Sequence, residues 1–292
     1  MDIKASDVKN LRDMTGAGML DCKKALTETN GDIDKAIDYL REKGISKAAK
    51  KADRIAAEGI ANIYTNGNKA VVVEVNAETD FVAKNQEFLN MVDTIGNTIL
   101  NSDVTDLEGA LNLNTENGTI SDLIVNETAT IGEKLSLRRI AVVNKNDDEV
   151  FGSYLHMGGR IASLVVIKGN DESVAKDVAM QSAAMRPKYV NRDEVPSEET
   201  EHERTVLTEQ ALTEGAKPEF VDKIIVGRLN KFYQEICLVE QTFVKDSDLT
   251  IEAYLKQNNS SVVKMVRFEV GEGMEKRSEN FADEVMGQIK NA

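Results

Sequence analysis

Tryptophan, proline, cysteine and histidine are scarce in this sequence, and each shortage excludes something. The 292 residues contain no tryptophan and 3 prolines, so we expect an aliphatic core and long helices rather than a loop-rich architecture. Two cysteines and two histidines are too few for a zinc site of the cysteine/histidine type. The motifs GxSxG, HExxH and GxxxxGKS/T of common enzymes do not occur. No cofactor is therefore expected, although an enzyme that uses carboxylates alone stays open.

The sequence also lacks long apolar runs and an excess of basic residues. No apolar run reaches the ~18 residues of a membrane-spanning helix, so no contact with the membrane interior is expected. The net charge of −14 argues against direct binding to nucleic acid or to an anionic membrane, because both need a basic surface. Cys22 and Cys237 lie far apart, and no secretory signal precedes them. We therefore expect reduced cysteines in a cytoplasmic protein.

The remaining composition is that of an ordinary globular chain, and its first part is predicted to be helical. Hydrophobic residues make up 41% and charged residues 29%, enough for two or three compact units. Residues 1–54 predict three short helices followed by a basic, alanine-rich connector. Ser6 is expected to cap the first helix, and the second covers roughly 19–28. Asp32 is expected to cap the third, which Gly44 terminates.

The central part of the sequence contains one pattern twice. Residues 67–84, GNKAVVVEVNAETDFVAK, align without gaps with residues 159–176, GRIASLVVIKGNDESVAK. Both segments indicate a hairpin turn, an apolar strand, an acidic helix start and an amphipathic helix. In the first copy this helix is expected to begin at Thr79 and Asp80. We interpret the pattern as an internal duplication of one hairpin-plus-helix unit.

The second copy is interrupted by a predicted helical hairpin. Ser197 can cap a helix that Gly215 ends, and Pro218 opens a second helix. Two helices joined by a short turn form an antiparallel pair. Strands resume near residue 240 and at 262–270, and a last helix covers 278–290.

The two copies differ at an acidic–aromatic pair. Asp80 aligns with Glu172, and an acid at a helix start is stabilised by the helix dipole by roughly 0.3–1 kcal/mol. Phe81 aligns with Ser173, although burying a phenylalanine contributes about 1.5–3 kcal/mol that a serine would forfeit. Either the copies have diverged in packing, or Phe81 is exposed as an anchor for a partner. His156, at the tip of the segment SYLHMGGR, is typical of a solvated turn residue.

These motifs together resemble the bacterial elongation factor Ts family over the whole chain. The segments LRDMTGAGMLDCKKAL (11–26) and EVNAETDFVAKN (74–85) are similar to long family motifs, and SYLHMGGR and RFEVGEGMEK occupy matching places. The resemblance implies a guanine nucleotide exchange factor without chemical catalysis. Its partner would be elongation factor Tu, both GDP-bound and nucleotide-free, and it would promote GDP release so that GTP can bind.

The resemblance also implies an α+β fold in several parts. These are a three-helix module similar to a ubiquitin-associated domain (1–54), a first core half (55–145), a second core half (146–185 and 238–276), an inserted helical hairpin often called the dimerisation or coiled-coil region (186–237), and a C-terminal helical module (277–292). Whether the hairpin mediates self-association is left open.

Site residues follow from the resemblance by position. The intruding segment would displace the partner's elements that hold Mg²⁺ and phosphate, and it comprises Thr79, Asp80, Phe81 and Val82. Other contacts with elongation factor Tu would involve Val8, Leu11, Met19, Leu20, Ile131, Gly132 and His156. Whether Asp80 acts on Mg²⁺ or only starts a helix stays open. The rival hypotheses are a generic binding module and a hydrolase with paired carboxylates.

Overall fold

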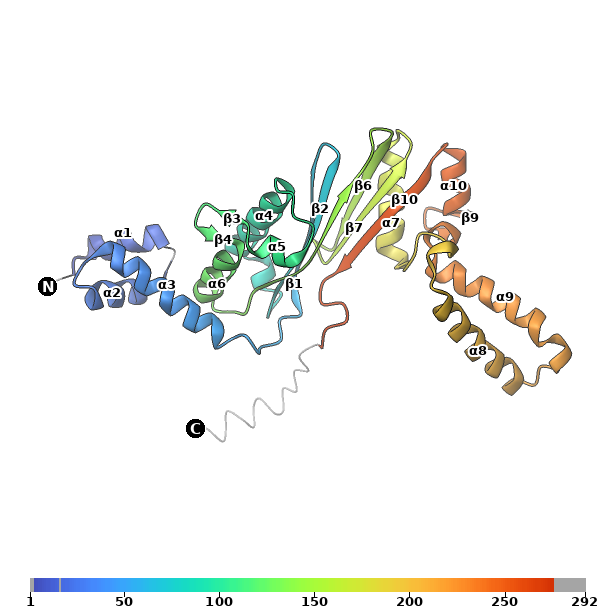
Figure 1. Ribbon diagram of the computed structural model, residues 1–292, viewed down its shortest axis with the longest axis horizontal. Helices are drawn as coiled ribbons and strands as arrows, with labels where there is room; N and C mark the ends of the chain where they lie inside the picture. The colour runs from blue at the N-terminus through green and yellow to red at the C-terminus, as the bar shows by residue number, and fades with distance from the viewer. Residues whose placement is uncertain (1–2, 16, 276–292) are drawn as a thin grey trace. The chain divides into compact units, whose positions relative to one another are not determined.

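The computed structural model describes residues 3–15 and 17–275, which form an α+β structure (Figure 1). Two three-stranded sheets have the orders β1-β2-β5 and β10-β7-β6. The chain divides into two compact units. The first contains the described parts of 1–62, 73–141 and 269–292, and the second contains 63–72 and 142–268. Within the described ranges, no helix combines the length and the apolar character needed to cross a bilayer.

Three helices form the N-terminal module, as predicted. They are α1 (Ala5–Thr15), α2 (Met19–Glu28) and α3 (Ile33–Ala49). The backbone N–H of Lys35 donates to the Asp32 carboxylate at 3.1 Å, so Asp32 caps α3 as expected. Ser6 lies inside α1 instead of capping it. A small core joins the helices and consists of Val8, Leu11, Cys22, Ala25, Leu26 and Ala36.

The prediction that Gly44 ends the third helix is wrong. Gly44 lies inside α3, is buried, and does not have the positive φ of a helix-ending glycine. A β-carbon at Gly44 would lie 3.5 Å from the Ala129 Cβ on α6 (Ile120–Ile131). This is an ordinary contact distance, so Gly44 packs against α6 with room for a methyl group, and the ion pair between Arg41 and Asp122 at 3.0 Å joins the same two helices.

The central strand of the first sheet, β2, is buried. Strands β1 (Glu58–Asn66) and β2 (Lys69–Ala77) are joined by a tight turn with Gly67 at φ +55°. From Ala70 to Ala77 every residue of β2 is buried, as its β-branched run predicts. The third strand is β5 (Ser136–Asn144), and α4 (Gln86–Leu100) buries one apolar face that includes Phe88. The remaining elements are α5 (Leu107–Leu111), β3 (Asn114–Thr115) and β4 (Gly118–Thr119).

The second sheet repeats this order of strands. A hairpin of β6 (Glu149–His156) and β7 (Ile161–Lys168) is followed by α7 (Glu172–Met185), and β10 (Ser261–Glu269) then pairs with β7. In both sheets the third strand joins the second strand of the hairpin, as the predicted duplication requires. The second unit also contains β8 (Thr242–Phe243), β9 (Asp246–Thr250) and α10 (Ile251–Gln257).

The two copies diverge where their helices begin. A helix starting at Thr79 and Asp80 was the expectation, and it is wrong. The chain makes a bend and one turn of 3-10 helix, η1 (Val82–Lys84), before Asn85 caps α4. The helix-dipole explanation for Asp80 is therefore excluded.

In the second copy the aligned residues are already helical. Asp171 caps α7, and Glu172 and Ser173 form its first turn. Ser173 and Phe81 consequently sit on different backbones, although both are exposed.

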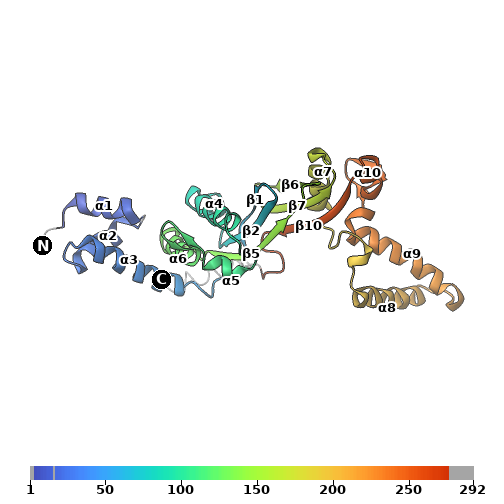
Figure 2. The same ribbon diagram turned by 45° about the horizontal axis from the view of Figure 1, so that its top comes forward.

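The inserted helical hairpin matches the prediction closely. Helices α8 (Ser197–Thr213) and α9 (Pro218–Ile236) lie side by side in Figures 1 and 2 and share an apolar seam. Gly215, at φ +88°, ends the first helix. Ser197 is the first helical residue and makes no capping bond. Short 3-10 turns flank the hairpin at η2 (Arg192–Glu194) and η3 (Leu238–Glu240). The helix predicted at 278–290 lies outside the described residues.

Candidate functional site

The bend after β2 presents an exposed phenylalanine. Phe81 is 81% exposed, although Ala83, two residues later, is buried. Asp80 is also exposed, and its carboxylate pairs with the Lys84 ammonium at 2.7 Å. Val82 is half-buried. The loop from Glu78 to Val82 thus holds one large apolar side chain in water while its end is anchored in the core.

A distant carboxylate holds the start of this loop. Glu133 accepts hydrogen bonds from the backbone N–H groups of Glu78 at 3.1 Å and Thr79 at 3.0 Å. It also accepts from the Thr79 hydroxyl at 2.7 Å. These amides lie just past the end of β2, where the sheet no longer supplies an acceptor. Glu133 therefore provides the acceptors that the backbone needs there.

The neighbouring side chains make the connection reciprocal. The Glu78 carboxylate accepts from the Lys134 backbone N–H at 2.6 Å and from the Arg54 guanidinium at 3.1 Å. The Lys51 ammonium donates to the Gly132 carbonyl at 2.6 Å. The basic connector after α3 is thus bonded both to the loop and to the end of α6.

Ile131 and Gly132 were predicted contacts, and they lie at this junction. Ile131 is the half-buried last residue of α6, and Gly132 is its exposed C-cap at φ +89°. Through Glu133 the structure brings them together with Thr79. Sequence reasoning missed Glu133 itself. The sequence does contain one indication of Glu133. An acid directly after a helix C-terminus is disfavoured by the helix dipole, so its presence there indicates an interaction with another part of the chain.

The predicted residues of the N-terminal module divide into two pairs. Val8 and Leu11 are 7% and 0% exposed in the module core, so their side chains serve packing. Met19 and Leu20 are 58% and 84% exposed at the start of α2. Only the second pair is available for direct contact with a partner.

His156 belongs to the second unit, at the end of β6. It is exposed, pairs across the hairpin with Ile161, and has its Nδ1 3.5 Å from the Tyr154 hydroxyl. The flanking Leu155 and Met157 are also exposed. The tip of this hairpin is therefore an apolar surface with one imidazole.

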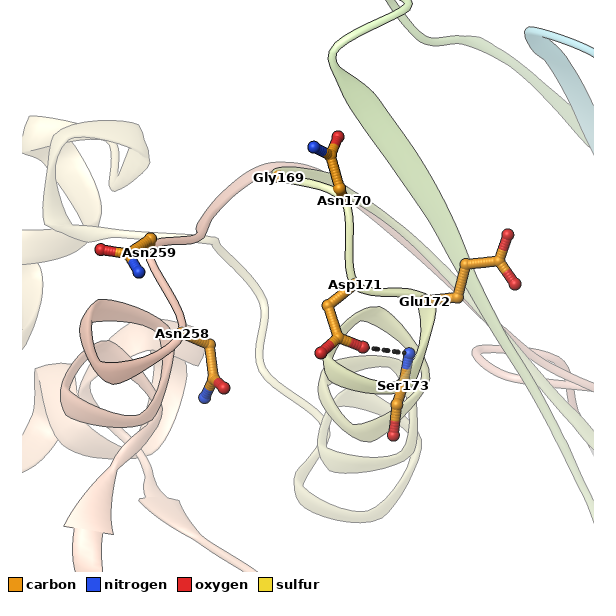
Figure 3. A pocket seen from close by; sticks show the side chains of 7 residues that line it. All are labelled: Gly169, Asn170, Asp171, Glu172, Ser173, Asn258 and Asn259. Atoms are coloured by element: carbon orange, nitrogen blue, oxygen red, sulfur yellow. Dashed lines mark hydrogen bonds between the residues drawn. The ribbon is translucent and has the colours of Figure 1, made fainter.

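A polar hollow in the second unit lies at the start of α7 (Figure 3). The Asp171 carboxylate accepts from the backbone N–H groups of Ser173 at 2.8 Å and Val174 at 3.2 Å. This cap already occupies the helix N-terminus with negative charge, so the hollow is unsuited to an anion. Among residues 3–15 and 17–275, no group of three or more side chains has the arrangement of a metal site.

Comparison with known protein families identifies a relationship. The family model described as Elongation factor TS matches residues 78–272. This range covers more than half of the 292 residues and begins at the first residue of the Phe81 loop. It also contains the end of α6, the β6–β7 hairpin and the inserted helical hairpin.

Proposed function

Because the chain belongs to the elongation factor Ts family, we propose that it expels GDP from elongation factor Tu by inserting the loop that carries Phe81. Family membership makes the chain a nucleotide exchange factor for elongation factor Tu in translation elongation. Such a factor is not an enzyme in the chemical sense, because no covalent bond of the nucleotide changes. The mechanism, the nucleotide states that are bound and a cytoplasmic location are parts of the proposal.

The energetic requirement is large but needs no catalytic residue. A nucleotide bound with a Kd of about 1 nM is held by about 12 kcal/mol. With an association rate of about 10⁶ M⁻¹s⁻¹, its release takes on the order of 10³ s. A coupling of about 4 kcal/mol would weaken binding roughly a thousandfold. Reciprocity then lets GTP weaken the binding of the exchange factor and expel it.

The observation that carries the proposal is the exposure of Phe81 on a braced loop. Burying such a ring against a partner supplies about 1.5–3 kcal/mol. The hydrogen bonds from Glu78 and Thr79 to Glu133 keep the loop ordered before binding, so little entropy is lost on insertion. Phe81 would wedge between partner helices and shift the elements that hold Mg²⁺ and phosphate.

Asp80 would act by charge beside this wedge. Its carboxylate would repel the nucleotide phosphates or compete for water around Mg²⁺, while the bond to Lys84 fixes its direction. The Asp80→Asn variant tests this part. GDP release that is unchanged across a series of Mg²⁺ concentrations would exclude a role for the charge.

Other surfaces are assigned by the same reasoning. We assign partner contacts to the exposed Met19 and Leu20, to Ile131 and Gly132, and to His156. Val8 and Leu11 would contribute indirectly, by packing the core of the module that carries Met19 and Leu20. The part boundaries given by the resemblance, and self-association through residues 186–237, stay predictions.

The test of function is release of fluorescent GDP from purified elongation factor Tu, followed by stopped flow. We expect the chain to accelerate release without converting GDP or GTP into other products. A complex that forms without faster release would indicate a generic binding module. New nucleotide products formed by the chain alone would indicate an enzyme.

A further inference from the structure

Building on the proposed function, we propose that Glu133 is a positioning residue that holds the Thr79–Phe81 turn in the shape that presents Phe81. Glu133 does not need to touch the partner for this role. Its three hydrogen bonds to Glu78 and Thr79 join the end of α6 to the start of the loop.

Thr79 connects this anchor to the exposed pair. Its hydroxyl donates to Glu133 and accepts from the Val82 backbone N–H at 3.3 Å. Its carbonyl accepts from the Ala83 N–H, also at 3.3 Å. Asp80 and Phe81 therefore form the tip of a turn whose two ends meet at Thr79. Releasing Thr79 from Glu133 frees the turn on its strand side.

The same carboxylate sets the spacing between two proposed partner contacts. Ile131 and Gly132 immediately precede Glu133, so the hydrogen bonds to Thr79 hold the end of α6 against the loop. The reciprocal bond from the Lys134 N–H to the Glu78 carboxylate prevents the two segments from pivoting about one point. The two surfaces would therefore approach the partner as one rigid element.

The contact uses both oxygens of the Glu133 side chain as acceptors. One Glu133 oxygen accepts both backbone amides, and the other accepts the Thr79 hydroxyl. Glutamine would offer an NH₂ group to the Thr79 hydroxyl and reverse the direction of that bond, so the hydroxyl would accept twice and its own proton would lose its acceptor. Alanine removes all three bonds, and the bound shape of the loop becomes a minor population that limits the rate of exchange.

A first experiment observes the loop without any partner. The chain has no tryptophan, so Phe81→Trp places a single tryptophan in the loop, which can be excited selectively over the 6 tyrosines. We expect the nanosecond anisotropy of this tryptophan to fall when Glu133→Ala is added. Glu108→Ala, which removes an exposed acid on α5, is the matched control and should leave the anisotropy unchanged. Equal anisotropy in all three proteins would overturn the proposal.

A second experiment measures GDP release as a function of exchange-factor concentration. Since the other contacts remain, we expect Glu133→Ala to lower the maximal release rate about tenfold while the half-saturating concentration stays within about threefold. Glu133→Ala added to Phe81→Ala should lower the rate no further, because the positioning residue acts through Phe81. A general loss of structure would instead raise the half-saturating concentration and add to the effect of Phe81→Ala.

The outcomes separate this inference from the proposed function. If the wild-type chain does not accelerate release, the proposed function fails. If it does, and Glu133→Ala retains the full maximal rate, only the role of Glu133 fails. Thr79→Val breaks the same contact from the loop side and provides the test should Glu133→Ala not fold, as judged by circular dichroism. Thr79→Ser keeps the hydroxyl and should restore the rate.

Discussion

Replacing Glu74 with glutamine should detach the segment that follows β10 from the first unit. Glu74 is fully buried on β2. Its carboxylate accepts from Arg138 at 2.9 Å, from Arg139 at 2.5 Å and from the Gly271 backbone N–H at 2.9 Å. Arg139 also donates to the Glu269 carbonyl at 3.0 Å. Arg138 donates to the Glu272 carbonyl as well, so both arginines connect Glu74 to the segment 269–272.

The size of the effect follows from burial. Removing one partner of a buried ion pair costs about 3–5 kcal/mol, because the other charge is left uncompensated. The side chains of Arg138 and Arg139 are 24% and 29% exposed, so water compensates part of this loss. We therefore expect Glu74→Gln to lower the free energy of unfolding by about 3 kcal/mol. Glu272→Gln removes an exposed partner of Arg139, 3.2 Å away, and should cost less than about 1 kcal/mol.

The effect should depend on pH in a defined direction. Burial alone would raise the pKa of Glu74, but the Gly271 N–H and the guanidinium groups of Arg138 and Arg139 together hold this pKa below its usual range. A carboxyl with a lowered folded pKa adds stability above its unfolded pKa of about 4.3 and loses it as the pH falls through the folded value. The difference between wild type and Glu74→Gln should thus be constant from about pH 8 to 5 and shrink below about pH 4.

Hydrogen exchange read by mass spectrometry is the suitable assay, because a chain of two units can unfold in more than one step. Peptides from 69–77 and 269–275 should exchange faster in Glu74→Gln, and peptides from the helical hairpin 197–236 should not. Unchanged exchange in the first two peptides would refute the reasoning about the buried carboxylate.

Three further predictions concern packing and thiol reactivity. Gly44→Ala should be tolerated and stabilise the chain by up to about 1 kcal/mol in thermal unfolding, because its β-carbon would meet Ala129 at an ordinary 3.5 Å and alanine favours helix. Gly152→Ala should destabilise by about 3 kcal/mol or more in the same assay, since its β-carbon would lie 2.1 Å from the Ala175 carbonyl oxygen; a smaller loss would contradict the close approach of α7 to β6. Burial raises the pKa of Cys237 to about 11, so this thiol should resist alkylation by iodoacetamide at pH 8 in the folded chain and react fully once unfolded.

Local signals in the sequence were sufficient for much of the fold. Asp32 caps α3 as predicted, because an acid before an apolar periodic segment satisfies amides of its own helix. The turn of the helical hairpin was also predicted correctly, because Gly215 has the positive φ that ends a helix and Pro218 begins the next one. Strand β2 was visible as a β-branched run after a turn glycine. In each case the interacting groups lie within a few residues of one another.

Predictions failed where the decisive partner is distant in the sequence. Gly44 has the signal of a helix end, but α3 continues past it and packs there against Ala129 of another helix. Thr79 and Asp80 have the signal of a helix start, but the chain bends there, and the hydrogen bonds at the bend run to the distant Glu133. The same cause hid Glu133 from the list of candidate site residues.

The alignment of Phe81 with Ser173 left the exposure of Phe81 as one of two alternatives. In the structure the Phe81 side chain is exposed. The comparison assumed one backbone for both copies, whereas Ser173 lies in a helix and Phe81 in a turn. The aligned serine was therefore no control for the packing of Phe81.

The central claim is that Phe81 drives the release of GDP, and one pair of variants tests it directly. Phe81→Ala and Phe220→Ala make the same change at two exposed phenylalanines, 81% and 53% exposed, of which only the first lies in the braced loop. Stopped-flow release of fluorescent GDP from elongation factor Tu would be measured at saturating concentrations of each variant. The account predicts that Phe81→Ala loses at least about tenfold of the maximal rate, roughly 1.4 kcal/mol of activation free energy, while Phe220→Ala retains it. Equal acceleration by both variants would contradict the account and assign the exchange activity to other surfaces of the chain.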